Sequence, residues 1–243
     1  MITRNPSLTD QVKAHIKEQI AEDGFVDGRI PPEVELAADL GVSRTTVRDA
    51  LTRLENEGTI YRRQGAGTFV NEQGLQIKSR LEEIWSYEQV LEDHGYVPSV
   101  RVLAETAEAA DPETVEALGL DAEDVVVSIE KLFLEDEEPV ILTVNRIPEE
   151  FLTGTEYTSD EATPIYDFLR DHCNRTLSYY LSEIIPVSLD EDAATKLGVA
   201  TGTLAISFDE IGYDQNNEPL VRATSYFRDD LLRFRLIRKK SGT

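Results

Sequence analysis

The sequence of 243 residues contains a single cysteine, Cys173. One cysteine cannot form an internal disulfide, and such scarcity favours a reducing compartment. No apolar run approaches the roughly 20 residues that span a membrane, and the N-terminus has no signal-peptide pattern. From these absences we expect a cytoplasmic protein without a membrane segment.

A catalytic or metal-binding set is also missing from the sequence. The three histidines, His15, His94 and His172, are scattered, and Cys173 has no evident base. There is no glycine-rich phosphate loop and no metal-ligand spacing. We therefore expect neither an enzyme nor a bound cofactor or metal ion.

Positive charge is scarce: 24 Lys and Arg stand against 47 Asp and Glu, and the formal net charge is −23. Acidic surfaces repel phosphate groups, so this charge is unusual for a DNA-binding protein. The excess is uneven, because residues 1–75 carry 9 basic and 12 acidic side chains, whereas residues 76–243 carry 15 and 35. Two interpretations of the acidic excess stay open, solubility and a salt-rich cytoplasm.

Residues 28–70 predict a helix, a tight turn, a second helix and a β-hairpin. In the second helix Val47, Ala50, Leu51 and Leu54 recur at helical spacing and form one apolar stripe. The stripe turns a set of polar residues outward, namely Thr45, Arg48, Asp49 and Thr52. This outer face is the one that a DNA major groove would meet.

The start of the second helix is marked by residues with specific backbone roles. Ser43 is placed as its N-cap, and Gly41 permits a left-handed turn after the preceding helix. Pro31 and Pro32 keep helical structure from running into this region. Free N–H groups in the first turn, next to Arg44, favour a phosphate.

At these residues the chain resembles the GntR family of transcription regulators, and YRRQGAGTFV (61–70) resembles the wing of its HutC subfamily. The resemblance implies a winged helix-turn-helix whose recognition helix reads bases and whose wing tip enters the minor groove. Pro32 and Val34 stand where many relatives have Ser and Arg, so one phosphate contact is expected to be missing. The expected DNA-binding residues are Arg44, Thr45, Thr46, Arg48, Arg62, Arg63, Gln64 and Gly65.

The chain is long enough for two domains. The first helix is expected to begin at Ser7, with Asp10 in a capping box, and another helix is predicted over residues 80–95. The expected parts are a winged helix-turn-helix domain at 1–70, a linker at 71–79 and a larger domain at 80–243. The linker is placed where the sequence shows neither helical nor strand periodicity.

The larger domain contains an internal repeat. Residues 110–146 align with residues 189–226, and each copy has a short helix ending in Leu-Gly, a strand, a polar turn and a second strand opened by Glu-Pro. Two such units predict an antiparallel sheet of about six strands with helices on one side, hence an α+β fold. Pseudo-symmetry of this sort places a cavity between the copies.

This arrangement resembles the UTRA ligand-sensing domain, a fold shared with chorismate lyase. The resemblance rests on the Glu-Pro turns, on TPIYDFL (163–169) and on SYFRDD (225–230). It implies that the larger domain binds a small-molecule effector.

Polar side chains on apolar strand faces are the candidates for that site. The repeat makes Lys131 and Glu210 equivalent, so they would present opposite charges to one cavity, each costly to bury alone. The alternative is that both lie at strand ends and reach water. The expected effector-binding residues are Lys131, Thr143, Asn145, Tyr166, Glu210, Arg222, Ser225 and Arg228, although Arg228 could equally pair with Asp229 or Asp230.

The resemblance also bears on the kind of effector. Related sensors of sugar phosphates share an Arg-x-Arg on this strand, where the present chain has Lys131 and Phe133, and a Glu on the next strand, where it has Thr143 with Asn145 beyond. One lysine offers fewer donors to a dianionic phosphate than two arginines. A singly charged, zwitterionic or neutral metabolite is therefore expected.

We expect a ligand-controlled transcription regulator, most often a repressor in this family, that binds a near-palindromic operator as a homodimer. Two alternatives stay open. One is an enzyme of the chorismate-lyase type, for which no catalytic set is present. The other is a DNA-binding module whose second domain only dimerises, which a filled core between the repeats would favour.

Overall fold

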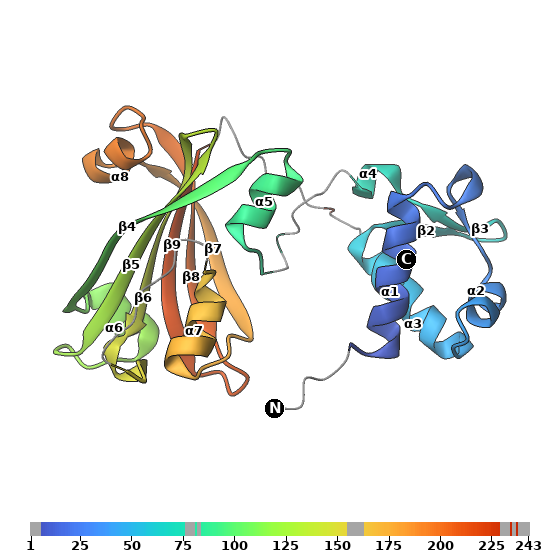
Figure 1. Cartoon of the computed structure of the whole chain (residues 1–243), viewed down its shortest axis with the longest axis horizontal. Coiled ribbons are helices and arrows are strands. Elements are labelled where there is room, and N and C mark those ends of the chain that lie inside the picture. Colours follow the sequence, from blue (N-terminus) through green and yellow to red (C-terminus); the bar gives the residue numbers. More distant parts are fainter. Residues whose placement is uncertain are drawn as a thin grey trace. The chain divides into compact units, whose positions relative to one another are not determined.

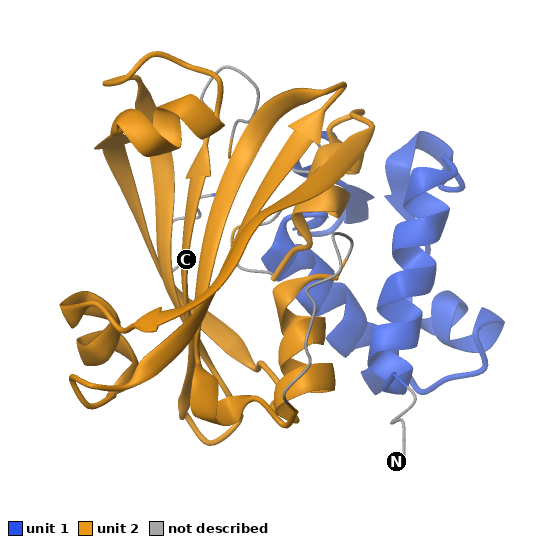
Figure 2. Ribbon diagram, turned by 60° about the vertical axis from the view of Figure 1, so that its left-hand side comes forward, with its two compact units in different colours: residues 1–78, 235–243 blue, residues 79–234 orange. Residues whose placement is uncertain are grey.

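The computed structural model of the chain describes residues 6–75, 81, 84–154, 163–228, 234 and 237. The chain divides into two compact units, residues 1–78 with 235–243 and residues 79–234 (Figure 2). The sequence-based division into 1–70, 71–79 and 80–243 stays a prediction. None of the described helices is long and apolar enough to cross a membrane.

The first unit is a small helical domain with a three-stranded antiparallel sheet of order β1-β3-β2. Its described elements are α1 (Leu8–Ala21), the 3-10 helix η1 (Val26–Gly28), β1 (Arg29–Ile30), α2 (Glu33–Asp39), α3 (Arg44–Glu57), β2 (Ile60–Arg63), β3 (Gly67–Val70) and α4 (Glu72–Leu75) (Figure 1). The helical turn α4 lies within the segment predicted as a linker.

Apolar periodicity builds the core of this unit. The predicted stripe on α3 is buried, with Val47, Ala50 and Leu54 fully inaccessible, and it packs with Val12 and Ile16 of α1. Burial of each large apolar side chain contributes about 1.5–3 kcal/mol. The stripe therefore fixes which face of α3 is left exposed to solvent.

The second unit contains a six-stranded antiparallel sheet of order β4-β5-β6-β9-β8-β7. Its elements are α5 (Tyr87–Asp93), β4 (Pro98–Ala109), α6 (Pro112–Leu118), β5 (Val125–Glu135), β6 (Glu138–Pro148), the 3-10 helix η2 (Glu149–Phe151), α7 (Ile165–Cys173), β7 (Tyr179–Ser188), α8 (Glu191–Lys196), β8 (Leu204–Tyr213) and β9 (Pro219–Phe227). The predicted α+β class is confirmed.

The two copies of the repeat form the units α6-β5-β6 and α8-β8-β9, which meet along β6 and β9. Val144 lies opposite Thr224 in the register, and the repeat alignment makes these two residues equivalent. The pseudo-twofold axis therefore passes between them. Each short helix ends at a glycine with a left-handed backbone, Gly119 (φ +67°) and Gly198 (φ +68°), as its Leu-Gly ending suggests.

Helices cover both faces of the sheet, so the prediction of helices on one side is wrong (Figure 1). Successive side chains of β5 alternate between faces: Phe133 packs with α5, whereas Leu132 and Leu134 pack with α8. The reason is that β5 is apolar on both faces, which requires a cover on each side. The face that carries α5 and α7 is the one with the cavity described below.

Helix α5 is shorter than the predicted helix over 80–95. It begins after Ser86, whose side chain accepts a hydrogen bond from the backbone N–H of Gln89, and Ile84 and Trp85 precede it without helical structure. The N-cap preference of serine outweighs the helical periodicity upstream of it. As a result Trp85 and Tyr87 are free to reach the cavity.

Candidate DNA interface and ligand cavity

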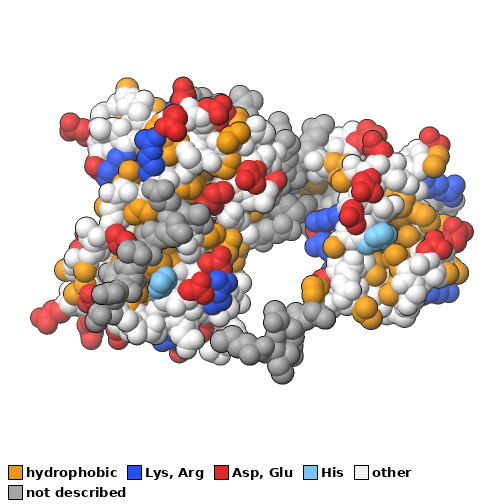
Figure 3. Space-filling view, in the orientation of Figure 1, with side chains coloured by type: hydrophobic (Ala, Val, Ile, Leu, Met, Phe, Trp, Pro, Cys, Tyr) orange, Lys and Arg blue, Asp and Glu red, His pale blue; other side chains and the backbone are white. Residues whose placement is uncertain are grey.

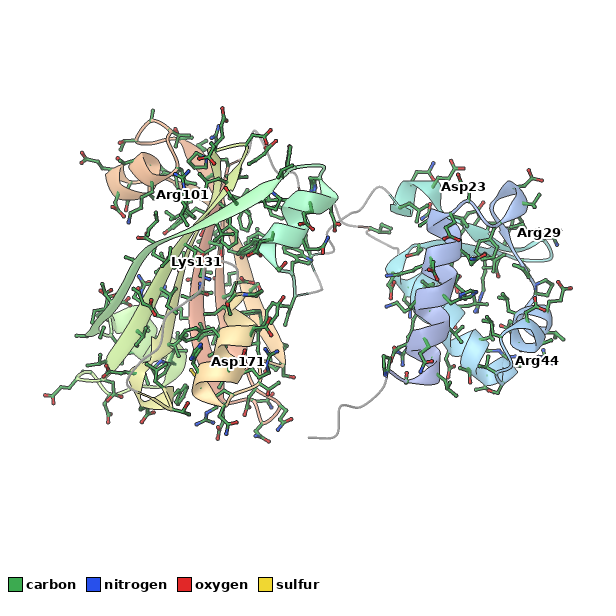
Figure 4. All side chains as sticks on the ribbon, viewed as in Figure 1. Asp23, Arg29, Arg44, Arg101, Lys131 and Asp171 are labelled. Carbon is green, nitrogen blue, oxygen red and sulfur yellow. The ribbon has the colours of Figure 1, made fainter. Side chains whose placement is uncertain are left out.

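The turn before α3 is built as the sequence predicts. Gly41 has a left-handed backbone (φ +65°), and Ser43 accepts a hydrogen bond from the N–H of Thr46 at 3.1 Å. Arg44 and Thr45 are exposed in the first helical turn (Figure 4 labels Arg44). The exposed face of the first turn can thus offer a guanidinium, a hydroxyl and backbone N–H groups to a phosphate or a base edge.

Arg48 is exposed on the same helix but has an acidic partner in the free protein. Its Nε and Nη2 atoms donate to Oε2 of Glu33 on α2, at 3.2 and 3.1 Å. The hydrogen bond from this guanidinium to Glu33 raises the pKa of Arg48. DNA that takes hydrogen bonds from Arg48 must therefore compete with Glu33, a partner that the sequence pattern does not indicate.

The wing is the hairpin of β2 and β3, in which Arg63 pairs with Gly67 across the strands. At its tip Gln64 and Gly65 are exposed, and Gly65 has a left-handed backbone (φ +76°). Arg62 turns back toward α3, where its Nη2 donates to Thr52 Oγ1 at 3.3 Å and its Nε lies 3.5 Å from Glu55 Oε2.

Acidic side chains are spread over the visible face of both units (Figure 3). On the candidate interface the basic residues are Arg44, Arg48, Arg62 and Arg63. The DNA-binding role of this surface is therefore expected to depend on a few arginines rather than on a broad positive field.

A cavity of about 490 Å³ lies within the second unit. Its walls are the strands β5, β6, β7, β8 and β9, the segment that leads into α5, and the beginning of α7. Six of the residues predicted for effector binding line it: Lys131, Thr143, Asn145, Tyr166, Glu210 and Ser225. The structure thus brings together residues that are 94 positions apart in the sequence.

Lys131 and Glu210 line this one cavity from equivalent strands, and neither is the terminal residue of its strand. Lys131, which is labelled in Figure 4, lies near the middle of β5 and is only 7% exposed. Its Nζ donates to the carbonyl oxygen of Thr163 at 2.8 Å. Glu210 accepts a hydrogen bond from Ser182 on β7, and burial raises the pKa of the Glu210 carboxyl.

Two of the predicted residues do not reach the cavity. Arg222 projects from the opposite face of the sheet, where its Nη1 donates to Thr114 Oγ1 at 3.1 Å and its Nη2 donates to Glu113 Oε2 at 2.6 Å. Arg228 donates to the carbonyl oxygen of Pro139 at 2.9 Å. Because side chains alternate along a strand, Arg222 cannot share a face with Ser225.

Several cavity residues are absent from the sequence-based set. They include Trp85, Tyr87, Tyr180, Ser182 and Phe208, and the hydroxyl groups of Tyr87 and Ser225 lie 2.8 Å apart. Phe208 belongs to the repeat, but the others come from β7 and the start of α5, outside it. Burial raises the pKa of Cys173 to about 11, so this thiol is not an activated nucleophile.

Comparisons with known proteins agree with this geometry. The model of the "Bacterial regulatory proteins, gntR family" matches residues 8–70, and the model of the UTRA domain matches residues 93–233. The chain is 28% identical over 227 residues to the HTH-type transcriptional repressor NagR of Bacillus subtilis, covering 93% of this chain and 91% of NagR. It is 31% identical over 186 residues to the histidine utilization repressor of Pseudomonas putida, covering 76% and 69%.

Solved structures show the same fold. YydK from Bacillus subtilis superposes with a TM-score of 0.74 at 18% identity, covering 96% of this chain and 100% of YydK. PhnF from Mycobacterium smegmatis gives a TM-score of 0.60 at 25% identity, covering 94% and 100%. The related proteins are named as transcription regulators, so the chorismate-lyase alternative is set aside. The chain belongs to the GntR family of transcription regulators, in the HutC-type branch that carries a UTRA domain.

Proposed function

We propose that this ligand-responsive regulator binds a near-palindromic operator as a homodimer and is released from it by a small metabolite. The observation that carries the proposal is the presence, in one chain, of an exposed recognition helix and a walled cavity of about 490 Å³ in a separate unit. Repression is the mode we expect, since NagR and the histidine utilization repressor are named as repressors.

The homodimer is expected to form chiefly through residues 80–243. A single winged helix-turn-helix domain covers too little DNA for tight specific binding. A dimer with two-fold symmetry matches the two half-sites of a palindromic operator. The outer strand β7 supports this assignment, because Leu181 is 60% and Ile185 40% exposed on it. Long apolar outer strands are normally covered in soluble proteins, and a second copy of this chain would cover β7.

The effector is expected to be singly charged, zwitterionic or neutral. Among the described cavity residues Lys131 is the only cation, and Glu88 and Glu210 are acidic. A dianionic phosphate would meet one ammonium group and two carboxylates, which is unfavourable.

The cavity also argues against a second domain that only dimerises, because a filled core between the repeats would leave no such space.

The proposal is tested by selecting binding sequences for the full chain from a random DNA pool at defined salt. Recovered sites with two inverted half-sites about one helical turn apart are expected. A metabolite screen by thermal shift then identifies ligands, which are tested for release of that DNA. Single half-sites, or ligands that stabilise the protein without affecting DNA binding, would contradict the proposal.

A further inference from the structure

Glu210 is a half-buried carboxylate on the wall of the cavity. It is aligned with Ser182 across β8 and β7, and the Ser182 hydroxyl donates a hydrogen bond to it. No lysine or arginine of the described part of the chain lies within 4.0 Å of its oxygens. A negative charge that is partly removed from water and has no positive partner is unfavourable.

Lys131 does not supply the missing positive charge. Its Nζ is held at the carbonyl oxygen of Thr163, at 2.8 Å. The strands β6 and β9 lie between Lys131 and Glu210, which corresponds to roughly 14 Å of sheet at the usual strand spacing. Accordingly burial raises the pKa of Glu210 and the nearby Asp209 charge adds to the effect, and no positive side chain is among the groups that lower it.

The surroundings of Glu210 are aromatic. Tyr180 and Tyr87 line the same cavity, and burial, followed by the negative charge of Glu210, raises the pKa of each. Trp85 and Phe208 complete this part of the wall, with ring centroids 6.2 Å apart. Aromatic rings attract organic cations, and carboxylates pair with them.

We infer that Glu210, with Tyr87 and Tyr180 beside it, forms a subsite for an organic ammonium group, and that the effector carries this group. The inference rests on the proposed function, which makes this cavity the effector site. It narrows the effector to an ammonium-bearing molecule whose opposite end points toward Lys131. An ammonium with an acidic or acceptor group several bonds away would meet both charges.

The single tryptophan of the chain provides the measurement, because Trp85 lies on the cavity wall. The full chain is titrated with n-butylammonium chloride and, separately, with the uncharged n-butanol, at constant chloride and ionic strength. Trp85 emission and melting temperature are both followed. We expect a saturable response to the ammonium ion at a concentration at least tenfold lower than to the alcohol.

Two isosteric variants assign that preference. Glu210→Gln keeps an acceptor for Ser182 and is expected to abolish the preference for the ammonium ion. Glu183→Gln removes an exposed carboxylate from the neighbouring strand and is expected to leave it unchanged. If Glu210→Gln fails to fold, Glu210→Asp, which retains the charge, is expected to weaken but not reverse the preference.

Several results would overturn the inference. They are equal responses to both probes, no saturable response in emission or melting temperature, and loss of the preference in Glu88→Gln but not in Glu210→Gln. Tighter binding of the alcohol would instead indicate a protonated Glu210 that donates a hydrogen bond. The experiment contains no DNA, so its outcome is independent of operator binding. Ammonium binding without any effect of ammonium metabolites on DNA would contradict the proposed function while leaving the subsite intact.

Discussion

Arg44 and Arg48 of the recognition helix differ in their partners in the free protein. Arg44 has no acidic partner within 4.0 Å among the described residues, whereas Arg48 is held by Glu33. Both are exposed. For Arg48, therefore, part of any hydrogen-bond energy gained on DNA is offset because the hydrogen bonds to Glu33 must break.

We predict that Arg44→Ala and Arg48→Ala each lose about 1–3 kcal/mol of operator affinity, provided that the side chain makes a bidentate base contact. The larger loss is expected for Arg44→Ala. The measurement is an anisotropy titration of operator and scrambled DNA at the same salt concentration. Unchanged operator affinity would remove the residue from the base-reading set.

The raised pKa of Glu210 predicts how the stability of the folded protein depends on pH. Burial raises its pKa in the folded state above the usual value of 4.5. The folded state then binds the proton more tightly than the unfolded state, so protonation of Glu210 stabilises the folded protein. This stabilisation is fully present below pH 4.5 and is lost as the pH rises through the folded pKa. At neutral pH the ionised carboxylate is a cost to the folded protein.

Glu210→Gln is therefore expected to melt at a higher temperature than the unchanged protein at pH 7 to 8, since glutamine keeps the acceptor for Ser182 without the charge. The difference is expected to shrink as the pH is lowered toward about 4.5, because the carboxyl becomes protonated in both states. Thermal melts across this range measure it, with Glu183→Gln as control. A variant that melts lower at every pH would show that the ionised carboxylate does not destabilise the folded protein.

At the scale of elements, the two arginines of the wing differ in whether they contact other side chains of the protein. Arg62 contacts α3 through Thr52 and Glu55, whereas Arg63 next to the tip is exposed without an acidic partner within 4.0 Å in the described part of the chain. The hairpin places both on the strand that leads to the tip. We expect both side chains to contact phosphates rather than base edges.

We predict that Arg62→Ala and Arg63→Ala weaken binding to all DNA sequences by similar factors, with the larger effect for Arg63→Ala. Removing one arginine–phosphate ion pair is expected to reduce the slope of log K against log salt by about 1. Titrations at several salt concentrations measure the slope. A selective weakening on the operator, with an unchanged slope, would instead place the arginine on base edges.

At the scale of the whole molecule, the DNA-binding domain and the effector-binding domain belong to different compact units. A substitution on the cavity wall is therefore expected to change the response to effector more than the affinity for DNA. We predict that Lys131→Met and Glu210→Gln each abolish effector-induced release while operator affinity without effector stays nearly unchanged. The measurement is a DNA titration with and without the ligand found by thermal shift. Variants that respond at unchanged effector concentrations would exclude these side chains from the site.

Assembly is also a property of the whole molecule. We predict a homodimer of the full chain, and of residues 80–243 expressed alone, in sedimentation at micromolar concentration. If β7 forms the interface, Leu181→Lys is expected to shift the full chain toward monomer and to weaken operator binding, because each half-site is then bound separately. A chain that is monomeric without any substitution would contradict the assembly proposed here.

The sequence by itself determined the features that depend on near neighbours. The caps Ser7 and Ser43, the turn at Gly41 and the stripe on α3 follow from local hydrogen bonding and helical period. The repeat likewise determined the strand pairs and the equivalence of Lys131 and Glu210. The alternation of side chains would also have separated Arg222 from Ser225, had it been applied along β9.

Only the tertiary structure decided what depends on contacts between distant segments. It brought Glu33 to Arg48, and it placed Tyr87 and Tyr180, which lie outside the repeat, around Glu210. It also placed helices on both faces of the sheet. The physical reason is that burial and the pairing of charges depend on which elements pack together. The residue pattern within one element does not identify the element that packs against it.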